Sequence, residues 1–283
     1  MIYISSACVK HHKIADSVIE LAENGFTHIE LSGGTNYYPQ ILDDLLDLKN
    51  KYDLHYYIHN YFPPPKEHFV LNLASLDINV YNNTLDHFKN SVDLARELNI
   101  DKIGIHAGFY RDINLDTIGK DIDIKVMNNQ NDAIDKFIEG YGALREYAKG
   151  IKIYIENNVV SYNNYQRMKQ DPFMLTTYND YLELKKRISF TILLDIAHLY
   201  VSTHTLGISF NDQLDHLLPE TDYIHISAND GSKDENKLMS SEHEIINELK
   251  KYNFKNKIIT LEIYEKMEFL KKSYEVIKNL IKA

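Results

Sequence analysis

Residues 151–158 read IKIYIENN and residues 190–198 read FTILLDIAH, so two apolar runs each end on a carboxylate, Glu156 or Asp195. Short runs of this kind, rich in β-branched and aromatic residues, recur along the chain and are typical of strands. They predict eight strands, at Ile2–Ser5, His28–Leu31, Leu54–His59, Lys102–His106, Lys152–Glu156, Thr191–Asp195, Tyr223–Ser227 and Ile258–Glu262.

Longer segments with apolar residues at helical spacing separate these strands. In residues 85–95, Leu85, Phe88, Val92 and Ala95 follow the three-to-four-residue repeat of an amphipathic helix. The expected helices cover Ile14–Asn24, Ile41–Tyr52, Leu85–Leu98, Asp132–Ala148, Tyr178–Lys186, Ile245–Tyr252 and a last segment near Met267–Ile281. Glycines 25 and 150 lie where left-handed caps would end two of them. Strand–helix alternation repeated eight times in 283 residues predicts an α/β fold, a (β/α)8 TIM barrel forming one domain over residues 1–283.

Composition narrows the classes of function. The formal net charge of −10 opposes binding to a polyanion, and the lysines stand among acidic residues rather than in clusters, so a nucleic-acid partner is not expected. Cys8 is the only cysteine, which excludes an intramolecular disulfide and suits a reducing compartment. The apolar runs are far shorter than the roughly 20 residues needed to cross a bilayer, and no signal-peptide pattern precedes the first strand. We therefore expect a cytoplasmic protein without membrane contact. The sequence leaves the oligomeric state open, a homodimer included.

Polar residues stand at the carboxyl ends of seven predicted strands: Glu30, His59, His106, Glu156, Asp195, His225 and Glu262. In a parallel barrel these ends meet at one rim, which is where the active sites of this fold lie. Clustered buried carboxylates repel one another unless a cation compensates them. The pattern therefore predicts a divalent-metal site built from Glu156, Asp195, His225 and Glu262. Three carboxylates and one imidazole suit Mn, Co, Zn or Mg.

Four segments on successive strands together resemble one family. They are IENN (155–158), DIAH (195–198), HISAND (225–230) and LEIY (261–264), and the set is similar to the xylose isomerase-like TIM barrels, which include sugar and sugar-phosphate isomerases and epimerases as well as endonuclease IV. The resemblance implies that the four predicted ligands hold one ion chelated by the substrate. It also implies that Glu156 and Glu262 transfer a proton through an enediolate and that His198 contacts a substrate oxygen. Tyr61, in the loop after the third strand, is expected to wall the substrate pocket.

The endonuclease branch of the same family is the main alternative. His59 and His106 match positions that bind a second ion there together with Glu156, although they could instead bind substrate hydroxyls. A third ion of that branch uses an Asp-x-His motif, for which this chain has Asp234 and Asn236. An amide is a poor transition-metal ligand, so we expect the third site to be lost.

Three hypotheses follow from these residues. The leading one is a metal-dependent isomerase or epimerase of a small carbohydrate or its phosphate. Ketose 3-epimerases place an arginine where this chain has Gly231, so the substrate need not be a free ketohexose. The second hypothesis is an endonuclease IV-like phosphodiesterase acting at abasic sites, and the third is a non-catalytic sugar-binding barrel.

Overall fold

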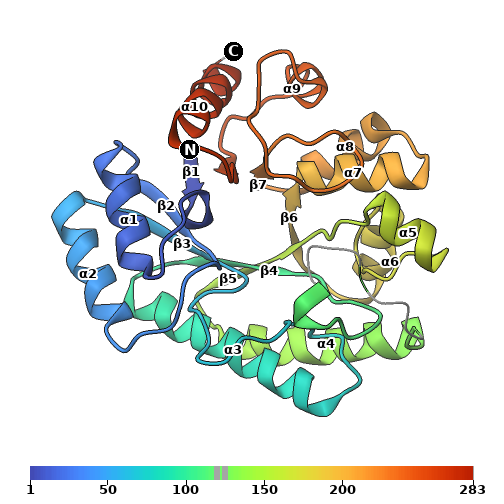
Figure 1. Ribbon diagram of the computed structural model, residues 1–283. Coiled ribbons are helices and arrows are strands. Elements are labelled where there is room, and N and C mark those ends of the chain that lie inside the picture. Colours follow the sequence, from blue (N-terminus) through green and yellow to red (C-terminus); the bar gives the residue numbers. More distant parts are fainter. Residues whose placement is uncertain (118–121, 123–126, 283) are drawn as a thin grey trace.

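The computed structural model describes residues 1–117, 122 and 127–282. Within these residues eight parallel strands close into a barrel in chain order (Figure 1). The strands are β1 (Ile2–Ser5), β2 (His28–Leu31), β3 (His55–His59), β4 (Lys102–His106), β5 (Lys152–Glu156), β6 (Thr191–Asp195), β7 (Tyr223–Ile226) and β8 (Ile258–Leu261). This confirms the predicted α/β barrel, and no strand boundary differs from its expected position by more than one residue.

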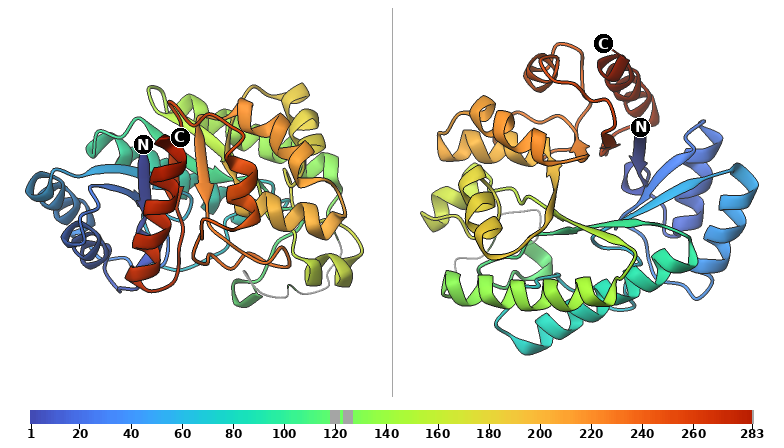
Figure 2. Two further views of the ribbon diagram at one scale, coloured as in Figure 1. Left: turned by 90° about the horizontal axis from the view of Figure 1, so that it is seen from above. Right: turned by 180° about the vertical axis from the view of Figure 1, so that it is seen from behind.

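Helices surround the barrel on its outside (Figures 1 and 2). Those expected from the sequence are α1 (Ile14–Glu23), α2 (Ile41–Tyr52), α3 (Ile78–Glu97), α4 (Gln130–Tyr147), α6 (Tyr178–Arg187), α9 (Glu244–Leu249) and α10 (Met267–Lys282). Gly25 and Gly150 adopt φ values of 90° and 91°, which confirms the left-handed positions predicted after α1 and α4. None of the helices in the described part of the chain has the length and apolarity that a membrane crossing requires.

The sequence did not predict three further helices, α5 (Tyr162–Met168), α7 (Ile196–Leu206) and α8 (Phe210–Leu217). Short 3-10 turns also occur at η1 (Ser6–Cys8), η2 (Leu115–Thr117) and η3 (Leu218–Glu220). The expected start of α3 at Leu85 was wrong. The helix begins at Ile78 because Asp77 caps it, with its carboxylate accepting a hydrogen bond from the Asn79 N–H at 2.8 Å.

The interior of the barrel supports the site from below. Tyr57, Tyr154 and Tyr223 each precede a polar strand-end residue by two positions, so they face the same inward side. Their rings pack together, with centroids 5.7 Å apart between Tyr57 and Tyr223 and 5.3 Å apart between Tyr154 and Tyr223. This aromatic layer fills the barrel beneath the rim, so the polar side chains above it are confined to the carboxyl ends of the strands.

Strand register then pairs the polar ends across the sheet. His106 of β4 lies opposite Glu156 of β5, and Asp195 of β6 lies opposite His225 of β7. Gly104 lies opposite His59 of β3, and a Cβ at position 104 would come within 2.9 Å of the imidazole Cδ2 of His59. The glycine therefore leaves the space that the His59 ring occupies.

Candidate functional site

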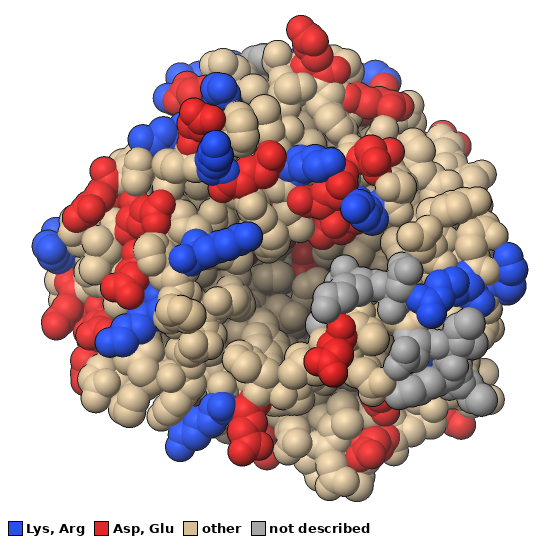
Figure 3. Space-filling view, viewed as in Figure 1, with Lys and Arg blue, Asp and Glu red and all other residues tan. Residues whose placement is uncertain are grey.

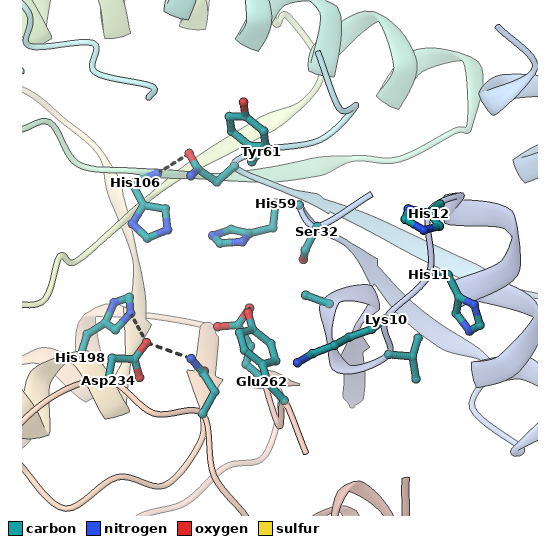
Figure 4. Close-up of a pocket in the computed structure, with 17 residues that line it drawn as sticks. Lys10, His11, His12, Ser32, His59, Tyr61, His106, His198, Asp234 and Glu262 are labelled. Atoms are coloured by element: carbon teal, nitrogen blue, oxygen red, sulfur yellow. Dashed lines mark hydrogen bonds and ion pairs between the residues drawn. The ribbon is translucent and has the colours of Figure 1, made fainter. Parts of the chain in front are cut away.

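A cavity of about 680 Å³ opens at the carboxyl ends of the strands. It appears as a hollow near the centre of the face in Figure 3. Figure 4 shows His59, His106, His198, Asp234 and Glu262 around this cavity. The side chains come from the ends of separate strands, from the loops that follow them and, for His198, from the first turn of the helix after β6, as expected for the active-site end of a barrel.

Glu156 lies at the centre of the polar cluster and is completely buried. One oxygen, Oε2, is 2.5 Å from His59 Nε2 and 3.1 Å from His106 Nε2. The other oxygen, Oε1, is 3.3 Å from His225 Nδ1. A single carboxylate thus contacts imidazoles from β3, β4 and β7.

His225 is held between carboxylates on both of its ring nitrogens. Nε2 is 3.0 Å from Glu30 Oε2, which also accepts a hydrogen bond from the Thr260 hydroxyl at 3.1 Å. Nδ1 faces Glu156 and lies 3.6 Å from Glu262 Oε2. When the ring is neutral and its Nε2–H donates a hydrogen bond to Glu30, the lone pair lies on Nδ1, on the side of Glu156 and Glu262.

Asp195 joins the site at the start of α7. Its Oδ1 accepts a hydrogen bond from the His198 N–H at 2.7 Å and so caps the helix, while Oδ2 lies 3.8 Å from His198 Nε2. The Asn157 side chain bonds both the N–H and the carbonyl of Asp195. These contacts fix the aspartate beside Glu156 and direct the His198 ring toward the cavity.

Burial and crowding change the ionisation of these groups. Burial raises the pKa of Asp195 to about 7; His198 lowers the pKa, and the neighbouring Glu156 and Asp234 carboxylates raise it. Burial lowers the pKa of His106 to about 4, which keeps this imidazole neutral and able to ligate an ion. Charging Asp195 without a cation therefore costs free energy. Burial also opposes charging Glu156 and Glu262, but the neighbouring histidines lower the pKa of both carboxylates.

The residues fit a divalent ion. In the part of the chain that the structure describes, three overlapping groups have ligand atoms within 4.8 Å of one another: Glu30, His59, His225 and Glu262; His59, His106 and Glu156; and Glu156, Asp195 and His198. Among the described residues, Glu156 Oε1 and His225 Nδ1 are buried without a hydrogen-bond partner although they face each other. Buried polar atoms without partners are costly, and a shared ion would satisfy both.

The structure distributes the predicted ligands over these groups. His225 and Glu262 lie together with Glu30 and His59, whereas Asp195 lies with Glu156 and His198. Glu156 connects the two sides through its contact with His225. The ligand set Glu156, Asp195, His225 and Glu262 stays a prediction.

Tyr61 and Asp234, two other residues considered in the sequence analysis, are held by hydrogen bonds beside the cavity. Tyr61 lines the cavity, but its hydroxyl turns away from it (Figure 4) and accepts a hydrogen bond from the Phe69 N–H at 3.0 Å. Asp234 Oδ2 is 3.6 Å from His198 Nε2 and accepts a hydrogen bond from the Asn236 amide at 3.0 Å. The amide at position 236 therefore donates to Asp234 where a ligating imidazole would have to point its lone pair at an ion.

Several lining residues were not singled out from the sequence, among them Lys10, His11, His12, Ser32 and Tyr264. Each follows a strand by a few residues, so the rule used for the strand ends, extended into the loops, would have found them. Tyr264 is closest to the proposed chemistry, because its hydroxyl donates to Glu262 Oε1 at 3.4 Å. Figure 4 shows the Lys10 amine extending toward the same carboxylate.

Comparison with known proteins agrees with this architecture. The family model described as xylose isomerase-like TIM barrel matches residues 18–280. A search of curated protein sequences found no match.

Solved structures share the fold over essentially the whole chain. A D-tagatose 3-epimerase-like protein superposes with a TM-score of 0.73 at 20% identity, covering 99% of this chain and 97% of the other. Endonuclease IV from Thermus thermophilus superposes with a TM-score of 0.63 at 14% identity, covering 99% and 98%. The 3-keto-D-glucoside 4-epimerase of E. coli superposes with a TM-score of 0.65 at 11% identity, covering 100% of this chain and 99% of the other. At these identities the likeness is one of fold, and it includes both sugar epimerases and a nuclease.

Proposed function

The chain belongs to the xylose isomerase-like TIM barrel family, and from this premise we propose that it is a divalent-metal-dependent isomerase or epimerase of a sugar or sugar phosphate. The observation that carries the proposal is the buried group of Glu156, His225 and Glu262, of which Glu262 lines the open cavity. Both glutamates lie within 3.6 Å of one imidazole nitrogen, Nδ1 of His225. A single substrate carbon above that nitrogen would be in reach of both.

Glu156, Asp195, His225 and Glu262 would hold the ion, which when bound polarises the substrate carbonyl and acidifies the adjacent C–H. One of the two glutamates removes the proton from that carbon, and the other returns a proton. His198 donates from Nδ1 to the Asn157 carbonyl at 2.8 Å, which leaves Nε2 toward Asp234 and the cavity. From there His198 binds a substrate oxygen and orients the reacting carbon.

The experiment measures metal content and proton exchange on the same preparation. Protein purified without chelator should contain a divalent ion by elemental analysis, and it should introduce solvent deuterium beside the carbonyl of a sugar that it isomerises. Glu262→Gln should reduce turnover by a factor of about 10² to 10⁴, as expected when a group that transfers a proton is removed. Glu146→Gln makes the same chemical change on the exposed side of α4 and should retain activity. Isomerisation without any bound ion, or full activity in Glu262→Gln, contradicts the proposal.

A second candidate, a phosphodiesterase, is favoured by the group of His59, His106 and Glu156 beside the first ion site. Two adjacent ions can stabilise the attacking and leaving oxygens of a phosphodiester. The surface argues against a nucleic-acid substrate, because lysines and acidic residues are interspersed around the hollow in Figure 3 and the net charge is −10. Two ions per chain together with cleavage of an abasic-site duplex would place this candidate first.

A further inference from the structure

A second cavity, of about 350 Å³, adjoins the first. His106, His198 and Asp234 line both cavities, so these three side chains form the boundary between them. The other walls of the second cavity come from α5, from the segment that follows α5 and from the loops that follow β4, β5 and β7 (Figure 1). A molecule bound at the proposed ion site could therefore extend past the boundary into a second, separately lined space.

One wall of the second cavity is apolar. Phe109, Ile113 and Phe173 line it, and the two phenylalanine rings meet edge to face with centroids 5.4 Å apart. These residues belong to a small cluster with Val70 and Ile122 that is separate from the core of the barrel. Apolar surface facing an open cavity is costly in water, at roughly 25 cal/mol per Å², and a ligand with an apolar face would cover it.

The remaining lining is polar but electrically balanced. Ser161, Asn163 and Ser232 supply hydroxyl and amide groups, and the Lys233 amine lies 3.5 Å from Glu235. Among the described residues that line the cavity, Lys233 and Asp234 are the only Lys, Arg, Asp or Glu side chains, so this lining has no excess of positive charge to select a phosphate. It suits a neutral ring with a flat apolar face and hydroxyls at its edge.

We infer that the second cavity binds a second sugar ring, so that the substrate is a glycoside or disaccharide rather than a free monosaccharide. This inference rests on the proposed function. The reacting sugar occupies the first cavity over Glu156 and Glu262, and the linked ring places its C–H face on Phe109 and Phe173. Its hydroxyls reach Ser161 and Asn163. The glycosidic link then lies beside His106 and His198.

The test compares affinities for one-ring and two-ring probes. Metal-loaded protein is titrated calorimetrically with D-glucose, maltose, cellobiose and 4-nitrophenyl β-D-glucoside. At least one disaccharide should bind about tenfold or more tightly than glucose, as expected when a second ring buries its apolar face. The affinity of the nitrophenyl glucoside should exceed that of glucose by a smaller factor, because its aromatic ring has no hydroxyl groups at its edge.

A variant that fills the second cavity tests whether the tighter binding of a disaccharide depends on that cavity. Asn163 lies exposed on α5 and lines the cavity, so Asn163→Trp should abolish the difference between the disaccharide and glucose. Tyr162→Trp introduces the same side chain at the preceding, exposed position, which does not line the cavity, and should retain the difference. Circular dichroism checks that both variants are folded.

The possible failures are distinguishable. If no disaccharide binds more tightly than glucose, or if Asn163→Trp retains the preference, the second-ring inference is wrong. If the protein nevertheless isomerises a free sugar, the proposed function is still supported. If the nitrophenyl glucoside gains as much as the best disaccharide, the cavity selects an aryl group and the inference is overturned. If the metal-loaded protein neither binds nor isomerises any sugar, the inference and the proposed function fail together.

Discussion

Replacing Glu30 by glutamine should weaken ion binding although we do not place Glu30 among the proposed ligands. Glu30 is fully buried, and its Oε2 is 3.0 Å from His225 Nε2 and 3.1 Å from the Thr260 hydroxyl. The carboxylate stabilises the tautomer in which Nε2 carries the proton and Nδ1 offers its lone pair to the ion. A glutamine at this position can turn its amide nitrogen toward Nε2, which would place the proton on Nδ1 and block ligation.

Loss of such a supporting carboxylate typically reduces metal affinity by about 10- to 100-fold, or about 1.4–2.7 kcal/mol. The assay is competition for Zn²⁺ or Co²⁺ against a chelating indicator, measured for wild type and Glu30→Gln. Thr260→Val is the matched control, because it removes the second donor to Glu30 but keeps the carboxylate, so its affinity should fall less. Unchanged affinity in Glu30→Gln would refute the role given to this contact.

Four further predictions follow from the geometry of the site and its surroundings. Gly104→Ala should destabilise the fold by about 1–3 kcal/mol in chemical denaturation, because its Cβ would lie 2.8 Å from the Leu193 side chain and 2.9 Å from the His59 ring; a variant as stable as wild type would contradict this packing. Chelation of the ion should lower the free energy of unfolding by about 2.7 kcal/mol, compared with protein in a free ion concentration of about 100 times the dissociation constant. An equal melting temperature with and without chelator would show that no ion binds the native state. If His106 belongs to a second ion site, His106→Ala should still bind one ion per chain, as counted by elemental analysis. Loss of all metal would instead make His106 a ligand of the main site. Burial raises the pKa of Asp171 from 3.8 to about 7, so the native state holds a proton that the unfolded chain releases, and the resulting stability is present below pH 3.8 and is lost as the pH rises to about 7. Asp171→Asn should therefore show a smaller fall in unfolding free energy over that range, and an identical pH dependence in the two proteins would count against the shift.

Most of the barrel could be predicted from the sequence because its signals are local. Strands such as β5 and β6 are continuous apolar runs ending on Glu156 and Asp195, which is the pattern of strands buried on both faces. Amphipathic helices such as α10 carry an apolar stripe at helical spacing.

Helix α7 was missed because it follows Asp195 without a loop and is buried over nearly its whole length, so it has little polar face to reveal a period. The early part of α3 was missed for the opposite reason, since residues 79–83 read NVYNN and carry few apolar side chains. In both helices a cap carboxylate, Asp195 or Asp77, set the start that periodicity did not show.

The sequence by itself determined which residues stand at the strand ends, because strand period and chain order place them there. Only the tertiary structure decided how they meet. Barrel closure places Glu30 of β2 against His225 of β7, residues far apart in the chain. The second cavity has the same origin, since loops after β4, β5 and β7 converge on it. Register, side-chain rotamers and cavity walls depend on packing between distant segments, and no local pattern in the sequence encodes that packing.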